Sequence, residues 1–300
     1  MTRSLSAAVL VTAVAVAVGI QSRTVPGQAP QSASAGGKHP YFDSLIARPD
    51  LLAAYSLRDP KQLDHPSNGG FAHSNKRPLV VIYDEAMDAA RITVGTGSNS
   101  LTNQVRLPIP THAPRSLFVT WDAWFGQEFE HGTHHIRNYK TFQFGSPFHD
   151  IHMEVRNRFE LAPGTAGLID GRLYPEGGYS VGPNVRNADT LEPRQGSFRI
   201  RTGTWTRYWA FFDAPPGPND HWYRYSLWAA DAKTGPVLIY DRLQVRPSPK
   251  SATASWESFW LEYNTSTNPV RRGRPPLVAY ARNVVALVGL ADPRPLLIRP

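Results

Sequence analysis

Short runs with apolar residues at alternate positions recur along most of the chain, separated by Gly, Pro, Asn and Asp residues that favour turns. This alternation predicts β-strands joined by short connections. The predicted strands cover 78–84, 90–95, 116–125, 139–145, 150–161, 197–203, 207–213, 222–231, 236–245, 258–264 and 277–290. The run 277–290 is almost entirely apolar and therefore ambiguous, but its β-branched residues and the Asn283 at its middle favour a strand.

Helical patterns are nearly absent. A short helical turn is predicted after His39 and ends at Pro49. No long segment shows a period of 3.6 residues, and no repeat of fixed length suggests a solenoid or a propeller. The high counts of Pro, 27, and Gly, 23, also favour a turn-rich β protein. We therefore predict an all-β fold, a two-sheet antiparallel jelly-roll sandwich that forms a single domain over residues 36–300.

The first 35 residues differ in composition from the rest. Arg3 precedes the apolar run LSAAVLVTAVAVAVGI, which is followed by a stretch rich in Ser, Gly, Pro and Gln. This order is typical of a secretory signal peptide and the start of a linker, with Ala33-Ser34-Ala35 as the best cleavage site. An uncleaved anchor is the alternative, although the run is Ala-rich and slightly short for a span. We expect a secreted or periplasmic protein with no stable membrane span after cleavage.

The cysteine count and the net charge limit the classes of protein to which this chain can belong. The chain has no Cys, which excludes disulfides, thiolate metal sites and cysteine nucleophiles and, with export, fits a bacterial protein. The formal charge is +8, mostly from Arg. Two explanations remain open: affinity for anionic polymers such as uronic-acid polysaccharides, or the Arg codons of a GC-rich genome. Nucleic-acid binding is not expected, because the basic residues are spread along the chain and no binding motif occurs.

The stretch FHDIHMEVRNRF, residues 148–159, separates two kinds of residue by alternation. Ile151, Met153 and Val155 occupy the odd positions, whereas the even positions carry His152, Glu154, Arg156 and Arg158. Because alternate residues of a strand lie on opposite faces, the even set forms one polar row. On a convex face this row is solvated and makes cross-strand ion pairs; on a concave face it is the floor of a groove. The preceding strand carries Lys140 and Gln143, and five of the ten histidines lie nearby, which favours the groove (His131, His134, His135, His149 and His152).

The aromatic residues and the histidines also offer candidates for sugar binding and metal binding. Trp228 and Trp260 are the tryptophans selected for stacking on sugar rings, the second with Glu262 on its face, although most Trp residues in a sandwich belong to the core. The HGTHH segment, residues 131–135, has metal-ligand residue types, but its glycine and the predicted strands on both sides favour a plain exposed loop. We assign no metal site and no cofactor.

One segment resembles a known superfamily. In TWTRYWAFFDAPPGPNDHWYRYSLWAADAKTGPVLIYDRLQV, residues 204–245, a strand opening with Trp precedes a polar turn, a strand ending in W-x-x-D, a Gly-containing turn and V-L-I-Y-D. An apolar strand from Asn283 to Leu290 closes the pattern. This order of strands and turns resembles the concanavalin A-like lectin/glucanase superfamily over residues 115–290, and within it the bacterial polysaccharide lyases and laminarinase-like proteins.

The resemblance implies two curved antiparallel sheets whose concave face binds an extended sugar chain. It also implies that a structural calcium ion could be present, although no Asp-rich loop identifies a site for it. The glucanase motif E-x-D-x-x-E and the alginate-lyase triplet Q-I-H are absent, and Asp150-Ile151-His152 is only loosely similar to the latter. The resemblance therefore transfers a fold and not a reaction.

The leading functional hypothesis is a polysaccharide lyase that acts on an anionic, uronic-acid polysaccharide by β-elimination. This reaction needs a group that neutralises the carboxylate, a base and an acid. The candidate catalytic residues are His152, Arg156, Tyr139 and Tyr263, and the candidate substrate-binding residues are Lys140, Gln143, Glu154, Arg158, Trp228, Trp260 and Glu262. A glycosidase using Glu154 and Glu262 ranks lower, since it needs their strands to face one another. The alternative is a non-catalytic carbohydrate-binding or cell-envelope protein of the same fold.

Overall fold

The structure is a computed structural model that describes residues 39–58, 80–94, 100–108, 116–129, 138–146, 149–156, 165–169, 173–176, 180–181, 198–213, 223–246, 258–266 and 277–300. The chain divides into two compact units, Met1–Gln31 and Ser32–Pro300. The predicted leader lies outside the described residues, and every element below belongs to the second unit. The described residues contain no helix long and apolar enough to cross a membrane.

The larger sheet has nine strands in the order β10-β14-β13-β12-β5-β16-β3-β2, with β1 also paired to β16. These strands are β1 (Leu51–Tyr55), β2 (Val80–Asp84), β3 (Ala89–Val94), β5 (Ser116–Phe125), β10 (Ser180–Val181), β12 (Thr206–Asp213), β13 (Tyr223–Asp231), β14 (Val237–Arg246) and β16 (Leu277–Val288).

The smaller sheet has seven strands in the order β11-β8-β7-β6-β15-β4, with β9 also paired to β7. These are β4 (Ser100–Pro108), β6 (Asn138–Ser146), β7 (His149–Arg156), β8 (Thr165–Ile169), β9 (Leu173–Glu176), β11 (Phe198–Arg201) and β15 (Ser258–Ser266). Every described pairing in both sheets is antiparallel. The predicted two-sheet antiparallel jelly-roll sandwich is confirmed.

Strand β5, whose sequence is SLFVTWDAWF, explains how the larger sheet is covered. Nearly all of its residues are buried, so both of its faces are packed. On one face Phe118 belongs to an apolar cluster with Phe42 and Leu45 of α1 (Pro40–Ile46) and with Leu287 of β16. On the other face Trp121 stacks on Tyr208 of β12, with ring centroids 5.1 Å apart.

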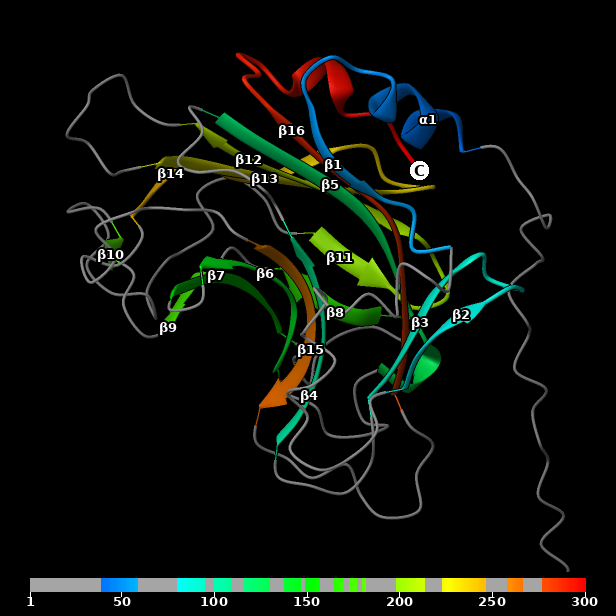
Figure 1. Ribbon diagram of the computed structural model, residues 1–300. Coiled ribbons are helices and arrows are strands. Elements are labelled where there is room, and N and C mark those ends of the chain that lie inside the picture. The colour runs from blue at the N-terminus through cyan, green and yellow to red at the C-terminus, as the bar shows by residue number, and fades with distance from the viewer. Residues whose placement is uncertain are drawn as a thin grey trace, which may run out of the picture. The chain divides into compact units, whose positions relative to one another are not determined.

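Figure 1 shows α1 and the C-terminal segment on one side of β5 and β16, and strands β6, β7 and β15 on the other. The larger sheet is therefore the middle layer, and it has no face left for an extended ligand over β5. The C-terminal segment includes the short helix η4 (Arg294–Leu296), and Leu296 and Leu297 pack on the same cluster as α1.

Several of the element predictions were correct. The strand 116–125 has the predicted bounds, the ambiguous run 277–290 is a strand, and the helical turn after His39 is α1. Strands β1, β4, β8, β9 and β10 were missed. β4, with the sequence SLTNQVRLP, is polar at alternate positions but has few apolar residues, and β8 to β10 are short.

Asn283 marks an irregularity in β16. Its φ is +58°, in the left-handed region that Asn tolerates better than most residues. The register of β16 against β5 shifts between Arg282 and Val285, which is a β-bulge. The backbone N–H of Asn283 donates to the carbonyl of Ser56 at 3.1 Å instead of to β5. The bulge aims the Asn283 side chain at the cluster described below.

Candidate functional site

The register of the smaller sheet aligns five residues in one cross-strand row. Gln143 of β6 lies opposite His152 of β7, and His152 lies opposite Tyr174 of β9. On the other side, Gln143 lies opposite Trp260 of β15, which lies opposite Arg106 of β4. Directly opposed residues of antiparallel strands share a face. The row therefore crosses five strands on one face, which spans about 19 Å at about 4.8 Å per strand interval.

Strand β11 shows which face of the smaller sheet this is. Phe198 and Ile200 are buried, whereas Arg199 between them is exposed. Arg199 lies opposite Leu168 of β8, and Leu168 lies opposite Arg156 of β7. Arg156 therefore shares a face with the exposed Arg199, and His152 and Glu154 share it by alternation along β7. Strands β6, β7 and β15 are bowed in the same sense, with their hollow side away from β5 and β16 (Figure 1).

Most of the predicted binding residues fall on this hollow face, called the polar face below. Lys140 lies opposite Glu154, and Glu262 lies opposite Gln104 in the same alternation as Trp260. A bulge in β6 between Lys140 and Phe142 keeps Lys140 and Gln143 on one face despite their odd spacing. The alternation also adds polar residues that the sequence analysis did not select: Arg106, Gln104 and Asn264.

Two predicted catalytic tyrosines fall on the opposite face. Tyr139 lies opposite Val155 and Thr265, and Tyr263 lies opposite Asn103, so both alternate with the positions of the row. By the same register they share a face with the buried Phe198 and Ile200. The register therefore separates Tyr139 and Tyr263 from His152. Tyr174, which was not selected, is the tyrosine that stands opposite His152.

Trp228 is not brought together with the polar face. Trp228 belongs to β13 of the larger sheet, opposite Trp209, and it packs against the apolar cluster beneath α1. It is on the other sheet from His152 because its strand pairs with β12 and β14. Arg158 and the HGTHH segment lie outside the described residues.

The larger sheet holds a second polar cluster, on its face toward α1, which the sequence analysis did not predict. Asp122 of β5 is 1% exposed and lies opposite both Arg207 of β12 and Arg282 of β16. Nε of Arg207 donates to Oδ1 of Asp122 at 2.7 Å, and Nη2 donates to Oδ2 at 3.1 Å. Nδ2 of Asn283 donates to Oδ2 at 2.9 Å. Asp122 is thus a fully buried carboxylate with three donors.

The electrostatics of Asp122 follow from these partners. Burial alone would raise the pKa of its carboxyl group, but the charges of Arg207 and Arg282 and the hydrogen bonds from Arg207 and Asn283 act against burial. The net effect is a pKa below the ordinary value, so Asp122 is ionised at neutral pH.

The cluster continues toward α1 through His39 and Asp88. Nε2 of His39 is 3.2 Å from Oδ2 of Asp88, and Nε of Arg58 is 3.5 Å from the same oxygen. Arg58 also donates to Oδ1 of Asn283. Burial, together with the nearby charges of Arg282 and Arg58, lowers the pKa of His39, although Asp88 acts in the opposite direction. His39 is therefore neutral at neutral pH.

A sequence signal for this second cluster did exist. Asp122, Arg207 and Arg282 each interrupt a strongly apolar strand, and a buried ionisable residue needs a partner. The partners could not be identified from the sequence because β5, β12 and β16 are far apart along the chain. Within the described ranges, no group of three or more His, Asp and Glu side chains is arranged to hold a metal ion.

Comparison with solved structures finds all-β carbohydrate-active enzymes at low similarity. An alginate lyase, Aly36B, solved as a mutant with an alginate tetrasaccharide, has a TM-score of 0.48 and 13% identity, covering 80% of this chain and 94% of that chain. The alginate lyase of family PL-14 from Aplysia kurodai has a TM-score of 0.44 and 10% identity, covering 80% and 99%. An endo-1,3-β-glucanase from Streptomyces sioyaensis has a TM-score of 0.39 and 11% identity, covering 70% and 79%.

These TM-scores lie below 0.5, and they carry no argument about a reaction or about which residues act. No protein-family model matches the chain, and no curated protein matches it. A function has to be argued from the site itself.

Proposed function

We propose that this protein is a carbohydrate-active enzyme whose polar face binds an extended anionic polysaccharide and cleaves it by β-elimination. The observation that carries the proposal is the row Arg106–Trp260–Gln143–His152–Tyr174 across five strands of the smaller sheet. The row joins a cation, an aromatic ring, an amide, an imidazole and a phenol on a face whose alternate positions are polar.

Cleavage of a uronate polymer by elimination requires three functions in one place. The carboxylate must be neutralised so that the proton at C5 becomes acidic, a base must remove that proton, and an acid must protonate the leaving oxygen. Gln143, next to His152, has an amide that donates to a carboxylate oxygen at the cleaved bond. Arg156, four residues along β7, and Arg106, three strands away, supply positive charge at neighbouring sugar units. His152 is the proposed base, because imidazole is the side chain that most often serves as a general base near neutral pH.

Tyr174 is the proposed acid in place of Tyr139 and Tyr263. It is opposite His152 in the register, so the two residues are on adjacent strands of the same face. Directly opposed residues have Cβ atoms about 4.5–5.5 Å apart, a spacing that allows two side chains to serve one bond of a substrate. Tyr139 and Tyr263 are on the other face and have no role in this mechanism.

The length of the row suits a polymer better than a monosaccharide. A line of about 19 Å accommodates several sugar rings along the strand-to-strand direction. Trp260 is a stacking position on one side of His152, and Lys140 and Arg156 add cationic positions beside the row. A uronate polymer carries one negative charge per uronic-acid residue, which fits repeated cationic positions.

The second candidate is a non-catalytic carbohydrate-binding protein. Trp260 favours it, because an aromatic ring next to Gln143 and Arg106 would hold a sugar chain without any chemistry. The two candidates differ only in whether bound polymer is cut.

The test is incubation of the mature protein with alginate, glucuronan, pectate and a heparin-type polymer, followed by ultraviolet absorbance of the unsaturated uronide product. The lyase proposal predicts new absorbance with at least one of these polymers. It also predicts that His152→Ala lowers kcat by about 10²-fold or more, the usual contribution of a general base. His149→Ala is the matched control, since His149 is in the same strand at a position of the opposite face.

Binding of a polymer without new absorbance would support the second candidate and exclude the first. If neither cleavage nor binding occurs with any of the polymers, both candidates are wrong. Equal loss of activity in His152→Ala and His149→Ala would remove His152 from the mechanism.

A further inference from the structure

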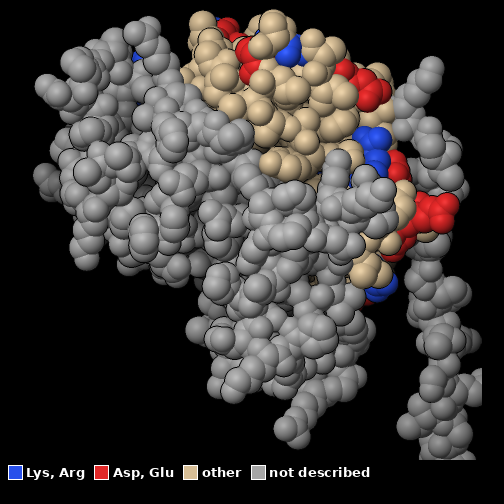
Figure 2. All heavy atoms as spheres, viewed as in Figure 1, with Lys and Arg blue, Asp and Glu red and all other residues tan. Residues whose placement is uncertain are grey.

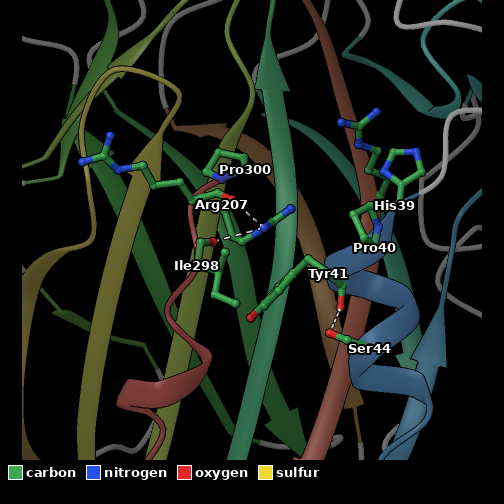
Figure 3. A pocket seen from close by; sticks show the side chains of 9 residues that line it. His39, Pro40, Tyr41, Ser44, Arg207, Ile298 and Pro300 are labelled. Atoms are coloured by element: carbon green, nitrogen blue, oxygen red, sulfur yellow. Dashed lines mark hydrogen bonds between the residues drawn. The ribbon is translucent and has the colours of Figure 1, made fainter.

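A pocket of about 460 Å³ lies on the face of the larger sheet that carries the Asp122 cluster. It is bounded by α1, by strands β12 and β16, and by the C-terminal segment. The residues used below are His39, Tyr41, Ser44, Arg207, Arg282 and Ile298. Figure 3 shows Tyr41 and Arg207 approaching one another from α1 and β12, with Ser44 farther along the helix. The pocket is separate from the polar face, which is on the other sheet.

Arg282 is the residue in this pocket whose hydrogen bonding is incomplete. It is 8% exposed, and its Nε and Nη1 atoms are buried without any hydrogen-bond partner. Its guanidinium group packs over the ring of Trp205 at 3.8 Å. The carboxylate of Asp122 is 3.7 Å from Nε, too far for a hydrogen bond, and already accepts from Arg207 and Asn283. A buried guanidinium with unused donors needs an acceptor.

Arg207 is held in a different way. Besides Asp122, it donates from Nη1 to the carbonyl oxygens of Ile298 and Arg299 at 3.1 and 3.2 Å, and it packs over the ring of Tyr41 at 4.2 Å (Figure 3). Its position is therefore fixed by the helix, the sheet and the C-terminal segment. Arg207 supplies charge to the pocket, and Arg282 supplies free donors.

The charges of the cluster, which are buried or partly buried, do not balance. Three guanidinium groups, of Arg58, Arg207 and Arg282, face two carboxylates, of Asp88 and Asp122. His39 is neutral because its pKa is lowered. The cluster therefore has one excess positive charge where there is little water. Arg299 and Pro300 on the rim of the pocket are left out of this count because they are exposed, so water screens their charges.

We propose that this pocket binds a small organic monocarboxylate, with its carboxylate on Arg282 and its carbon skeleton against Tyr41 and Ile298. A guanidinium group donates to a carboxylate, and an oxygen of the ligand that accepts from the free Nη1 of Arg282 would satisfy this donor and neutralise its charge. A single negative charge balances the single excess positive charge, whereas a phosphate group near neutral pH carries more. The apolar walls, from Tyr41, Pro40 and Ile298, suit a ring or short chain.

The described surface around the pocket argues against a polymeric anion at this site. Figure 2 shows that, on the face it draws, charged side chains of both signs are scattered among a majority of uncharged ones within the described residues. A long polyanion needs a continuous basic track, which the described surface in this view does not show. The ligand is therefore small enough to enter the pocket with its charged end first.

The experiment uses calorimetric titration of the full protein at constant ionic strength. The probes are sodium benzoate and sodium glucuronate, with benzamide and glucose as their neutral counterparts and inorganic phosphate as a second anion. The proposal predicts that at least one carboxylate binds at least tenfold more tightly than its neutral counterpart and more tightly than phosphate. Equal binding of the carboxylate and neutral probes, or tighter binding of phosphate, would overturn it.

Two variants locate the binding. Arg282→Gln removes the charge and should weaken carboxylate binding at least tenfold. Ser44→Trp changes an exposed helix position at the pocket and should block entry without altering any buried charge. Arg294→Gln is the control, because Arg294 pairs with Asp292 on the exposed surface outside the pocket. If Arg282→Gln does not fold, as circular dichroism would show, Ser44→Trp alone decides, and unchanged binding in it refutes the site.

The polar face is tested separately, so the two proposals fail independently. His152→Ala should leave monocarboxylate binding to this pocket unchanged, and Ser44→Trp should leave polysaccharide cleavage unchanged. If His152→Ala abolishes carboxylate binding, the ligand sits on the polar face and the pocket proposal is wrong.

Discussion

Arg207 and Asp122 form a two-point ion pair in the middle of the larger sheet, with both side chains buried. The residues are directly opposite one another on β12 and β5, so the pair ties these strands together on the face toward α1. Because Asp122 also accepts from Asn283 of β16, one carboxylate links three strands. The buried carboxylate is tolerated because Arg207 and Asn283 together donate three hydrogen bonds to its two oxygens.

Asp122→Asn should destabilise the fold strongly. The change leaves Arg207 and Arg282 buried without a carboxylate, and removal of one partner of a buried pair costs about 3–5 kcal/mol of unfolding free energy. Chemical denaturation measures this loss. Asp292→Asn is the control, because Asp292 pairs with Arg294 on the surface and its loss should leave the midpoint unchanged. A similar small effect from both variants would contradict the role assigned to Asp122.

His39 should make stability depend on pH below about 6.5. Burial and the charges of Arg282 and Arg58 lower the pKa of His39 in the folded state, so the unfolded chain binds its proton more readily. The free energy of unfolding therefore falls as the pH decreases from about 6.5, the ordinary value, toward the lower folded value. The measurement is the difference between the wild type and His39→Gln across this window. The free energy of unfolding of the variant should depend less on pH than that of the wild type. Identical pH dependence in the two proteins would exclude His39 as the source of the effect.

Tyr41→Phe should weaken the attachment of α1 to the sheet and the C-terminal segment. The Tyr41 hydroxyl donates to the carbonyl of Leu296 at 2.7 Å and accepts from Nε1 of Trp209 at 2.9 Å. Burial raises the pKa of this hydroxyl to about 12, so it stays protonated as a donor. Its removal leaves the buried indole N–H unpaired, at a cost of about 1–3 kcal/mol in thermal or chemical unfolding. Tyr83→Phe, which loses one bond to Asp88 at a less buried position, should have the smaller effect.

Trp260 and Trp228 should behave differently when replaced by Ala. Trp260 is in the row of the polar face, so Trp260→Ala should weaken polysaccharide binding on the order of 10-fold, as loss of an aromatic anchor does. Trp228 packs on the apolar cluster under α1, so Trp228→Ala should lower stability by about 2–3 kcal/mol and leave polysaccharide affinity unchanged. Affinity electrophoresis and denaturation separate the two effects. Reversed outcomes would mean that the ligand contacts the larger sheet.

The alternation of residues along each strand was readable from the sequence. The patterns in 116–125 and 150–161 predicted two strands, of which the second is described as β7 (His149–Arg156). The second pattern also separated Ile151, Met153 and Val155 from His152, Glu154 and Arg156, because a pleated strand places alternate residues on opposite faces. The missed strands were those in which the apolar half of the pattern is weak, such as β4, or which are too short to show a period, such as β10.

Strand order and register were decided only by the tertiary structure. A single strand does not specify which strand lies beside it, so the sequence could not predict that Trp228 and Trp260 are on different sheets or that Tyr174 stands opposite His152. The bulge in β6 that brings Lys140 and Gln143 to one face, and the bulge at Asn283 that completes the Asp122 cluster, depend on pairing with neighbouring strands. Between bulges, the sequence by itself determined which residues share a strand face, since that follows from local backbone geometry. The structure decided which faces meet, since hydrogen bonds between residues far apart in the chain set the neighbours.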